Sequence, residues 1–492
     1  MAPSASLMKA CNVNTLSVPI FKPCTNPSSS SRVFFSKSII ELTLHTSNSG
    51  HNNQHSNNNF PLLSFPSCSS KPDISTDSSD IENKPKGSSE QSSLVSKRQK
   101  ASKLDKNHAS ESLTTSPAKS SSSSSSPSRG LVFSLGPSDS WDGAEVGSPV
   151  VKRFLSDDEE RWFMWYHGRS NNRNPSSSDW VGLATSSNVV HWERGSDSAR
   201  SSSGVGYVMK CGKEWWEFDT KGIRPSEILM MCSSWASASS AAYWLYYTGY
   251  TYENVNFNEN PCLCFNDDGE SLNLFKSLPG LAVSHDGRHW ARVEGEHHNG
   301  ALFDVGDERD WDSLFISSPS VVCHGNSDFR MYYHSFDVEK GHFAIGLARS
   351  RDGRRRWVKL GKIMGGSGKV GSFEEFGVMN ACVIRNLRDG SYVMAYEGAG
   401  ADGKRSIGVA VSDDGLMDWV RVQDEAVLKP SEIGCWDDKC VGSPCLVQIM
   451  DRGTNNDEWR LYYTGVGNGG RGGIGMAVGD IRNFRRWRRF HA

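Results

Sequence analysis

Internal repetition is the feature that most constrains the fold of this chain. One unit occurs five times between residues 131 and 490: an apolar segment, an aromatic segment, a Gly-x-Ala-x-Ser segment or close variant, and a closing tryptophan. The closing residues are Trp192, Trp290, Trp357, Trp419 and Trp487, and the last four are 67, 62 and 68 residues apart. A regular period of this kind indicates an array in which each unit buries its apolar faces against its neighbours.

Each unit contains the segments for four short antiparallel strands. The first segments are VGSPVV (146–151), IRPSEIL (223–229), SSPSVV (317–322), VMNACVI (378–384) and VGSPCLV (441–447). Asp-Gly pairs at 286–287, 352–353 and 414–415 predict tight turns. Four strands per unit, repeated radially, predict an all-β, five-bladed β-propeller over residues 131–490; a β-sandwich with coincidental repeats is the alternative. We expect Leu131–Leu135 to add a strand to the last blade and close the ring.

The first 130 residues have a different composition. All 16 tryptophans lie at or beyond Trp141, and residues 1–130 are rich in Ser, Asn, Pro and Lys. Such a segment cannot bury enough apolar area to offset the entropy of ordering, so we predict that it is disordered. Residues 1–60, with no acidic residue before Glu41, have the make-up of a chloroplast transit peptide, and residues 61–130 are predicted to be a Ser-rich linker. The predicted location is the chloroplast stroma, and an ordinary disordered tail is the alternative.

Charge and cysteine spacing argue against several functional classes. Residues 1–130 carry 14 Lys/Arg and 8 Asp/Glu, and the remainder carries 40 and 48, so the globular part is acidic and nucleic acid is not an expected partner. The sequence contains no apolar run of about 18 residues, so we predict no membrane span. The 12 cysteines show no paired metal-ligand spacing, so we expect neither a metal nor a cofactor. Reduced thiols are the main expectation, and a regulatory disulfide is the alternative.

Strand connectivity predicts which residues share one end of the propeller axis. If strands A to D run outward from the axis, the segment before strand A and the loop from B to C open on the same face. This rim is predicted to be rich in carboxylates, histidines and aromatic residues. Candidate ligand-binding residues on it are His167, Arg169, Asp312, His334, Asp337, Glu375, Trp436 and Asp437. The second unit carries about 30 extra residues between Gly249 and Leu281, which predict a functional loop or lid.

The repeat also resembles a known family. Trp-Asp segments, Ser-Pro-Val-Val strands, Tyr-Tyr-Thr-Gly ends and Ile-Gly-x-Ala-x-Ser-x-Asp-Gly strands are similar to those of the arabinanase/levansucrase/invertase superfamily, especially family 43 glycosidases. The resemblance covers about residues 135–490. It implies three carboxylates in an axial pocket: an Asp in an Asp-Pro of the first blade, an Asp of the third and a Glu of the fourth. In this sequence these positions hold Ser148-Pro149, Ser318-Pro319 and Met379-Asn380.

The carboxylates that the resemblance implies are therefore absent from the matched positions. Serine and asparagine can hydrogen-bond a sugar, but neither can serve as a general acid near neutral pH. If the chemistry has moved, Glu397 is the best candidate acid, with Asp142 or Glu145 as its partner across the axis. An alignment shifted by a few residues would instead bring Glu145, Asp312 or Glu375 into play. Two hypotheses stay open: a glycosidase-like plastid protein that acts on or binds a carbohydrate, and a non-catalytic propeller that binds a ligand or protein partners.

Overall fold

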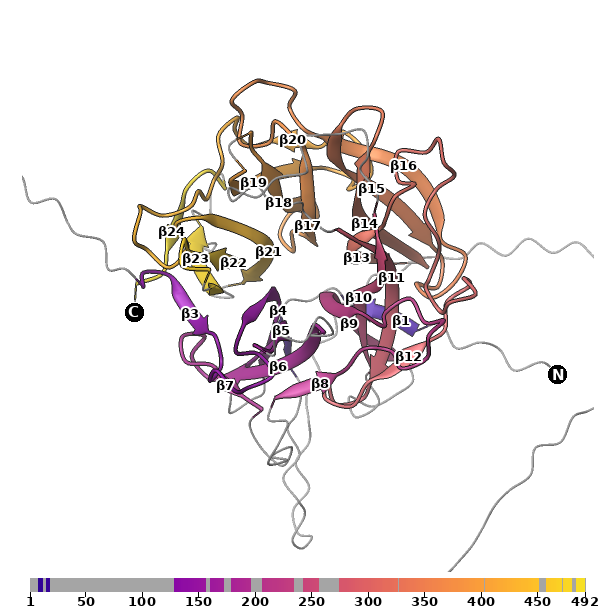
Figure 1. The fold of residues 1–492 in the computed structure, drawn as a ribbon, viewed down its shortest axis with the longest axis horizontal. Helices are drawn as coiled ribbons and strands as arrows, with labels where there is room; N and C mark the ends of the chain where they lie inside the picture. The colour runs from indigo at the N-terminus through magenta and orange to yellow at the C-terminus, as the bar shows by residue number, and fades with distance from the viewer. Residues whose placement is uncertain are drawn as a thin grey trace, which may run out of the picture. The chain divides into compact units, whose positions relative to one another are not determined.

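Five β-sheets surround a common axis in the computed structural model (Figure 1). The structure describes residues 8–11, 15–17, 128–155, 160–171, 178–195, 206–233, 242–255, 274–325, 327–401, 403–450, 457–470, 472–479 and 484–491. Every regular element within these ranges is a β-strand, and no helix occurs in them. The prediction of an all-β, five-bladed propeller is confirmed.

Each blade contains four antiparallel strands, of which the first lies nearest the axis (Figure 1). Blade one contains β4 (Glu145–Leu155), β5 (Glu160–Arg169), β6 (Trp180–Ser186) and β7 (Glu193–Arg194), and β8 (Tyr207–Met209) also pairs with β6. Blade two contains β9 (Gly222–Ser233), β10 (Ala242–Asn254), β11 (Phe275–Ser284) and β12 (Ala291–Val293). Blade three contains β13 (Ser317–Gly325), β14 (Asp328–Asp337), β15 (His342–Ser350) and β16 (Val358–Gly365). Blade four contains β17 (Val378–Arg385), β18 (Tyr392–Ala399), β19 (Arg405–Ser412) and β20 (Val420–Arg421). Blade five contains β21 (Cys440–Ile449), β22 (Glu458–Val466), β23 (Gly472–Gly479) and β24 (Trp487–Arg489).

The ring is closed by a strand from the start of the repeat region. β3 (Leu131–Ser134) pairs antiparallel with β23, so the last blade contains strands from both ends of the propeller sequence. The amide of Met476 also donates to the carbonyl of Gly130 (2.8 Å). The expected contribution of residues 131–135 to the last blade is therefore observed. This closure joins blades five and one by main-chain hydrogen bonds as well as by side-chain packing.

Tight turns between the third and fourth strands connect neighbouring blades. In blade two, Ser284 Oγ accepts the amide of Gly287 (2.9 Å), and this glycine has a φ of +71°. Trp165 of blade one donates its ring N–H to the carbonyl of Gly287 (2.9 Å). Tyr246 and Tyr332 bond to Gly353 and Gly415 of their following blades in the same way. In blades two, three and four, the predicted Asp-Gly turns therefore connect the third and fourth strands and also bind the sheet to the one before it.

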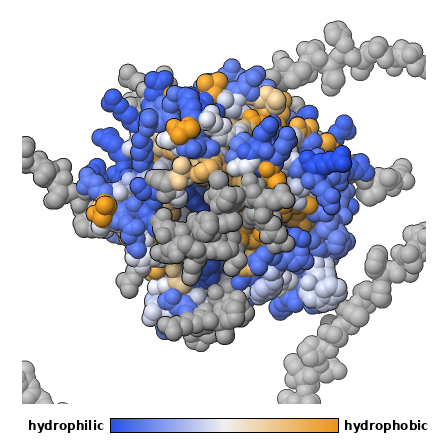
Figure 2. Space-filling view, turned by 45° about the horizontal axis from the view of Figure 1, so that its top comes forward, coloured by the Kyte–Doolittle hydropathy of each residue, from blue (hydrophilic) through white to orange (hydrophobic). Residues whose placement is uncertain are grey.

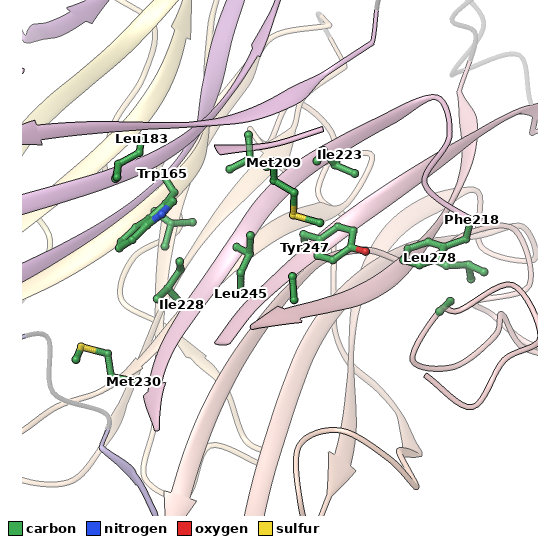
Figure 3. Close-up of a cluster of buried hydrophobic side chains, with 14 of the residues drawn as sticks. Trp165, Leu183, Met209, Phe218, Ile223, Ile228, Met230, Leu245, Tyr247 and Leu278 are labelled. Carbon is green, nitrogen blue, oxygen red and sulfur yellow. The ribbon is translucent and has the colours of Figure 1, made fainter. Parts of the chain in front are cut away.

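The hydrophobic core lies between blades rather than inside a single sheet. Five large clusters of buried side chains each combine residues of two adjacent blades. Figure 3 shows the cluster between blades one and two, where Trp165 and Leu183 of blade one face Ile228 and Leu245 of blade two. Burial of each large apolar side chain stabilises the fold by about 1.5–3 kcal/mol. Removal of one blade would therefore expose two interfaces at once.

Most of the predicted transit peptide and linker lies outside the described residues. Two short strands near the start of the chain are described: β1 (Met8–Cys11) pairs antiparallel with β9, and β2 (Thr15–Ser17) pairs parallel with β4. The insertion of the second unit also falls largely outside, at residues 256–273. In the described part of the chain, no helix has the length and apolarity needed to cross a membrane.

Candidate ligand-binding site

An acidic residue precedes the first strand of every blade, and in each blade it is buried. These residues are Asp142, Asp219, Asp312, Glu374 and Asp437. Each forms an ion pair of 2.6–2.9 Å with a basic residue two positions after the closing tryptophan; in the same order these are Arg194, Arg292, Lys359, Arg421 and Arg489. In four blades the same carboxylate oxygen lies 2.8–3.0 Å from the hydroxyl of a second-strand tyrosine, which donates to it: Tyr166, Tyr247, Tyr333 and Tyr463. Tyr396 occupies the equivalent position in blade four.

The aromatic residue before each acid completes this group, which we call the blade cluster. Trp141, Phe218, Trp311, Phe373 and Trp436 lie 5.5–6.2 Å, centroid to centroid, from the tyrosines of their own blades. A third-strand glycine lets the rings approach the sheet: a Cβ on Gly475 would lie 2.4 Å from Tyr463 Cζ. The blade cluster thus connects the first, second and fourth strands of one sheet.

The blade clusters account for four of the predicted site residues. Asp142, Asp312 and Asp437 are almost fully buried within their own blades, where each carboxylate is bonded to a tyrosine and to an Arg or Lys. Trp436 stacks on Tyr463 and donates its ring N–H to the carbonyl of Arg129 (2.9 Å). None of these four residues lines the axial cavity described below.

A cavity of about 260 Å³ opens at one end of the propeller axis. Its wall is built from the starts of first strands, the ends of second strands and the starts of third strands, as the connectivity predicted. Its polar lining consists of Ser148, Arg224, Ser226, Tyr250, Ser277, Ser317, Ser318, His334, Asn380, Lys404, Arg405, Lys439 and Ser443. Its apolar side is formed mainly by Leu274, Phe275, Phe315, Phe343, Phe376 and Met379. Among the described residues, the lining contains no aspartate or glutamate.

Four lining residues have left-handed backbone conformations at equivalent positions of four blades. Ser148, Ser318, Asn380 and Ser443 have φ between +45° and +52°. Each donates its amide N–H to a second-strand side chain of the preceding blade, at 2.8–3.3 Å; in order these acceptors are Thr464, Thr248, His334 and Glu397. Non-glycine residues in this conformation are uncommon, and such strained positions cluster at binding sites. The first three residues are those matched to glycosidase carboxylates by the family resemblance.

Glu397, the predicted catalytic acid, lies behind this wall. It is 1% exposed, and its Oε2 accepts hydrogen bonds from the Asn380 side-chain amide (2.7 Å) and the Ser443 backbone amide (2.8 Å). Its Oε1 pairs with Arg405 Nη1 (3.3 Å). The side-chain oxygen Oδ1 of Asn380 in turn accepts a hydrogen bond from the Ser318 hydroxyl (2.6 Å). Three donors surround the carboxylate. Two of the residues that donate to it, Asn380 and Ser443, line the cavity, whereas Glu397 itself does not.

Glu145, a predicted partner of Glu397, lies in a second charged cluster beside the cavity. Arg169 pairs with it directly, His167 Nε2 lies 3.1 Å away and Arg224 Nη2 lies 3.4 Å away. Burial, reinforced by the nearby Arg224 guanidinium, lowers the pKa of His167 to about 3. Asp179 anchors Arg224 through its Nε atom (2.7 Å). Burial alone would raise the pKa of Asp179, but the Arg224 guanidinium outweighs burial and lowers that pKa to about 2.

His334 is the one predicted ligand-binding residue that lines the cavity directly. Burial, with a contribution from the Arg405 guanidinium, lowers its pKa to about 3, so its ring is neutral near pH 7. Its Nδ1 accepts the Asn380 amide (3.3 Å), which leaves Nε2–H as a donor. Asp337 is buried against Lys362, and Glu375 accepts the amide of Gly371 in a loop (2.7 Å). Neither of these acids is in the lining.

Deeper along the first strands lies a group of polar side chains that the sequence did not single out. Lys152 Nζ and Glu227 Oε1 form a buried ion pair of 2.6 Å between blades one and two. Nearby, the amide of Val151 donates to Cys445 Sγ (3.4 Å), and the amide of Leu446 donates to Cys382 Sγ (3.3 Å). A hydrogen bond from the neighbouring Cys382 thiol, together with the Lys152 charge, lowers the pKa of Cys445 although burial acts to raise it. The cysteines whose side chains are described carry free thiols, and no cluster able to hold a metal ion is found in the described ranges.

The cationic residues of the cavity are the main feature that sequence reasoning missed. Arg224, Lys404, Arg405 and Lys439 come from three different blades or their connecting loops. Arg224 replaces the small residue found before the Ser-Pro pair in other units, for example Gly147 or Gly442. Arg405 stands at the start of a third strand where blades one and five have Asp179 and Gly472. These departures from the repeat are the sequence signal that could have identified the cationic residues of the cavity.

The described lining offers groups that can bind a small polar ligand. Hydrolysis by the common route needs two carboxyl groups that flank the scissile bond about 5–10 Å apart. The described cavity wall instead offers hydroxyl groups, one side-chain amide, one neutral histidine, four cationic side chains and several aromatic rings. Aromatic faces and hydroxyl donors are suited to a sugar ring.

Comparisons with known proteins find similar folds. No protein-family model matches the sequence, and no curated protein matches it. Among solved structures, a glycosyl hydrolase from Bacteroides ovatus is 14% identical, with a TM-score of 0.45, over 73% of this chain and 93% of that one. An N-acetylgalactosamine deacetylase from F. plautii, in complex with blood group B trisaccharide, is 14% identical, with a TM-score of 0.45, over 73% and 96%. A thermostable family-43 glycoside hydrolase is 14% identical, with a TM-score of 0.45, over 70% and 95%. The chain is a five-bladed β-propeller, and its structural neighbours include glycoside hydrolases.

Proposed function

We propose that the axial cavity binds a carbohydrate and does not hydrolyse it. The observation that carries this proposal is the identity of three cavity residues. Ser148, Ser318 and Asn380 line the wall at the positions where the resembled glycosidases carry their carboxylates. Glu397, the acid bonded to the lining residues Asn380, Ser443 and Arg405, is not itself in the lining and is occupied by these three donors. Among the described residues, a ligand in the cavity meets hydrogen-bond donors and aromatic side chains, and no carboxyl group that could protonate a leaving oxygen.

Calorimetric titration of the purified chain with a panel of mono- and oligosaccharides tests this proposal. At least one sugar should bind, and no panel member should release a product during prolonged incubation. Tyr250→Ala, which removes a ring from the cavity wall, should weaken binding at least tenfold. Tyr252→Ala is the matched control, because Tyr252 lies two residues further along β10, is 53% exposed and is not in the lining. Turnover that is lost in Glu397→Gln would show that the protein is a hydrolase, and a panel without any binder would remove the carbohydrate assignment.

The second candidate is a platform for protein partners. Val370 and Ile433 are each 93% exposed and both line a groove between blades four and five. On the face seen in Figure 2, however, exposed hydrophobic residues are scattered among hydrophilic ones instead of forming one broad patch. We therefore prefer the cavity as the functional site. A partner whose affinity falls in Ile433→Asp, with sugar binding intact, would support the platform.

We also propose that residues 1–60 direct the protein to the chloroplast stroma. The support is compositional: an N-terminal segment rich in Ser and Thr that carries Lys9, Lys22, Arg32 and Lys37 before its first acidic residue. A fluorescent protein fused behind residues 1–60 should enter chloroplasts, whereas a fusion to residues 61–130 should stay outside. Exclusion of the first fusion from chloroplasts would refute this proposal.

A further inference from the structure

The charge of the cavity specifies its ligand more closely. We propose that the bound sugar carries a negatively charged oxyanion, a carboxylate or a phosphate; this inference rests on the proposed carbohydrate-binding function. The described lining contains Arg224, Lys404, Arg405 and Lys439 and no carboxylate. A concave site walled by one sign of charge and by low-dielectric side chains concentrates ligands of the opposite sign.

Both arginines are held in place from outside the cavity. Asp179 binds Nε of Arg224 at 2.7 Å, and Glu397 binds Nη1 of Arg405 at 3.3 Å. Arg224 also lies 3.4 Å from Glu145 through Nη2. A guanidinium has five N–H donors, and these carboxylate contacts do not use all of them. The Arg224 and Arg405 side chains are 31% and 45% exposed, so part of each guanidinium remains accessible. Each arginine is thereby preorganised to present donors to an oxyanion, because the entropy cost of ordering its side chain is already met in the free protein.

Neutral groups on the same wall add donors and no competing negative charge. Ser148 and Ser443, whose hydroxyls can donate to a ligand, are among the lining residues. His334, neutral near pH 7, presents its Nε2–H. Among the described lining residues, an anion therefore meets cationic and neutral donors and no carboxylate.

The size and the apolar side of the cavity limit the rest of the ligand. A volume of about 260 Å³ is at the small end of ligand pockets, which suits one sugar unit better than a long chain. Phe315, Phe343 and Phe376 line the cavity together with Met379 and supply apolar surface for the carbon face of a ring. The combination selects a single charged sugar unit, either free or at the end of a chain.

Titration with ligands that share one skeleton tests this inference: glucose, glucuronate, glucose 6-phosphate and inorganic phosphate. We expect glucuronate or glucose 6-phosphate to bind at least tenfold more tightly than glucose, and the tighter of the two identifies the oxyanion. Raising NaCl from 50 to 300 mM should weaken the tighter ligand several-fold and leave glucose unchanged. Inorganic phosphate should bind at least tenfold more weakly than glucose 6-phosphate.

Substitutions separate the roles of the cavity charges from general effects. Lys439→Gln and Arg224→Gln should each reduce the affinity for the charged sugar about tenfold, a larger factor than any change in the affinity for glucose. Lys429→Gln is the control, since Lys429 is 57% exposed, pairs with Glu425 and is outside the lining. Urea unfolding of each variant checks that the fold is kept.

The outcomes distinguish this inference from the function on which it rests. Equal affinity for glucose and for both charged sugars would overturn the inference and leave carbohydrate binding intact. Failure of every sugar to bind would remove both. Inorganic phosphate that binds as tightly as glucose 6-phosphate would show an anion site without sugar recognition, which also overturns the inference.

Discussion

Replacement of Asp437 tests whether the acids before the first strands are structural. Asp437 is fully buried and accepts hydrogen bonds from the Tyr463 hydroxyl (3.0 Å) and Arg489 Nε (2.8 Å). Asp437→Ala leaves both donors without their acceptor. A hydrogen bond to a charged group contributes about 1.5–3 kcal/mol, and removal of one partner of a buried ion pair costs about 3–5 kcal/mol. Because the Arg489 side chain is 16% exposed and can recover some water, we expect a loss near the lower end, about 3 kcal/mol.

This loss corresponds to a measurable shift in thermal unfolding. An unfolding entropy of about 2.1 cal/mol/K per residue over roughly 360 residues converts 3 kcal/mol into a decrease in Tm of about 4 °C. Tyr463→Phe, which removes one of the two donors to this carboxylate, should cost about 1.5 kcal/mol. The control is Asp424→Ala, because the Lys369–Asp424 pair is 64% and 77% exposed; it should cost less than about 0.5 kcal/mol.

Calorimetry or circular dichroism gives Tm for the three variants, and sugar titration gives their affinities. The structural interpretation requires a large loss of stability in Asp437→Ala with ligand affinity unchanged at a temperature where the variant is folded. An unchanged Tm combined with lost binding would refute the structural interpretation and would show that Asp437 contributes to ligand binding.

Three further outcomes are expected. Stability should fall as pH decreases from about 6.5 toward 3, because His334 takes up a proton in the unfolded chain but not when it is buried, where its pKa is about 3. This histidine contributes a slope of about 1.4 kcal/mol per pH unit to the free energy of unfolding. His334→Gln should reduce that slope in pH-dependent urea unfolding. Gly475→Ala would place a Cβ 2.4 Å from a carbon of the buried second-strand tyrosine and should cost about 1–3 kcal/mol, whereas Gly469→Ala, with open space around it, should cost far less in the same assay. Lys152→Met should destabilise the fold by about 3 kcal/mol because it strands Glu227, and the double variant Lys152→Met/Glu227→Leu should recover most of that loss; no recovery would show that the pair is not the reason.

The fold could be predicted because its information is local and repeated. Each closing tryptophan, Asp-Gly turn and apolar first segment is visible within one unit, and five copies leave few architectures that bury their faces. The extra strand at Leu131–Ser134 could also be inferred, because an open ring would leave an edge unpaired.

The acids of the rim were harder to interpret because their partners are remote in sequence. Asp142 looks like a solvated loop residue until Arg194, 52 positions later, is found beside it. A signal was nevertheless present: every unit has an acid after an aromatic residue and a basic residue two positions after its closing tryptophan. Their joint recurrence indicates a contact within the blade. A residue type that recurs at the same position in all five blades stabilises each blade, since a single binding site on the axis would need it only once.

The reverse argument applies to positions where the units differ. The residue after the second-strand tyrosine is His167, Thr248, His334, Glu397 or Thr464. Four of these side chains accept the amide of a left-handed residue in the next blade, and threonine or histidine performs that task as well as glutamate. Accepting the backbone amide of the next blade therefore does not require a carboxylate at Glu397. Its additional effect is the pairing with Arg405, whose guanidinium reaches the cavity wall. Glu397 thus fixes the Arg405 guanidinium at the cavity wall, which is the reason to expect that the cavity binds an anion.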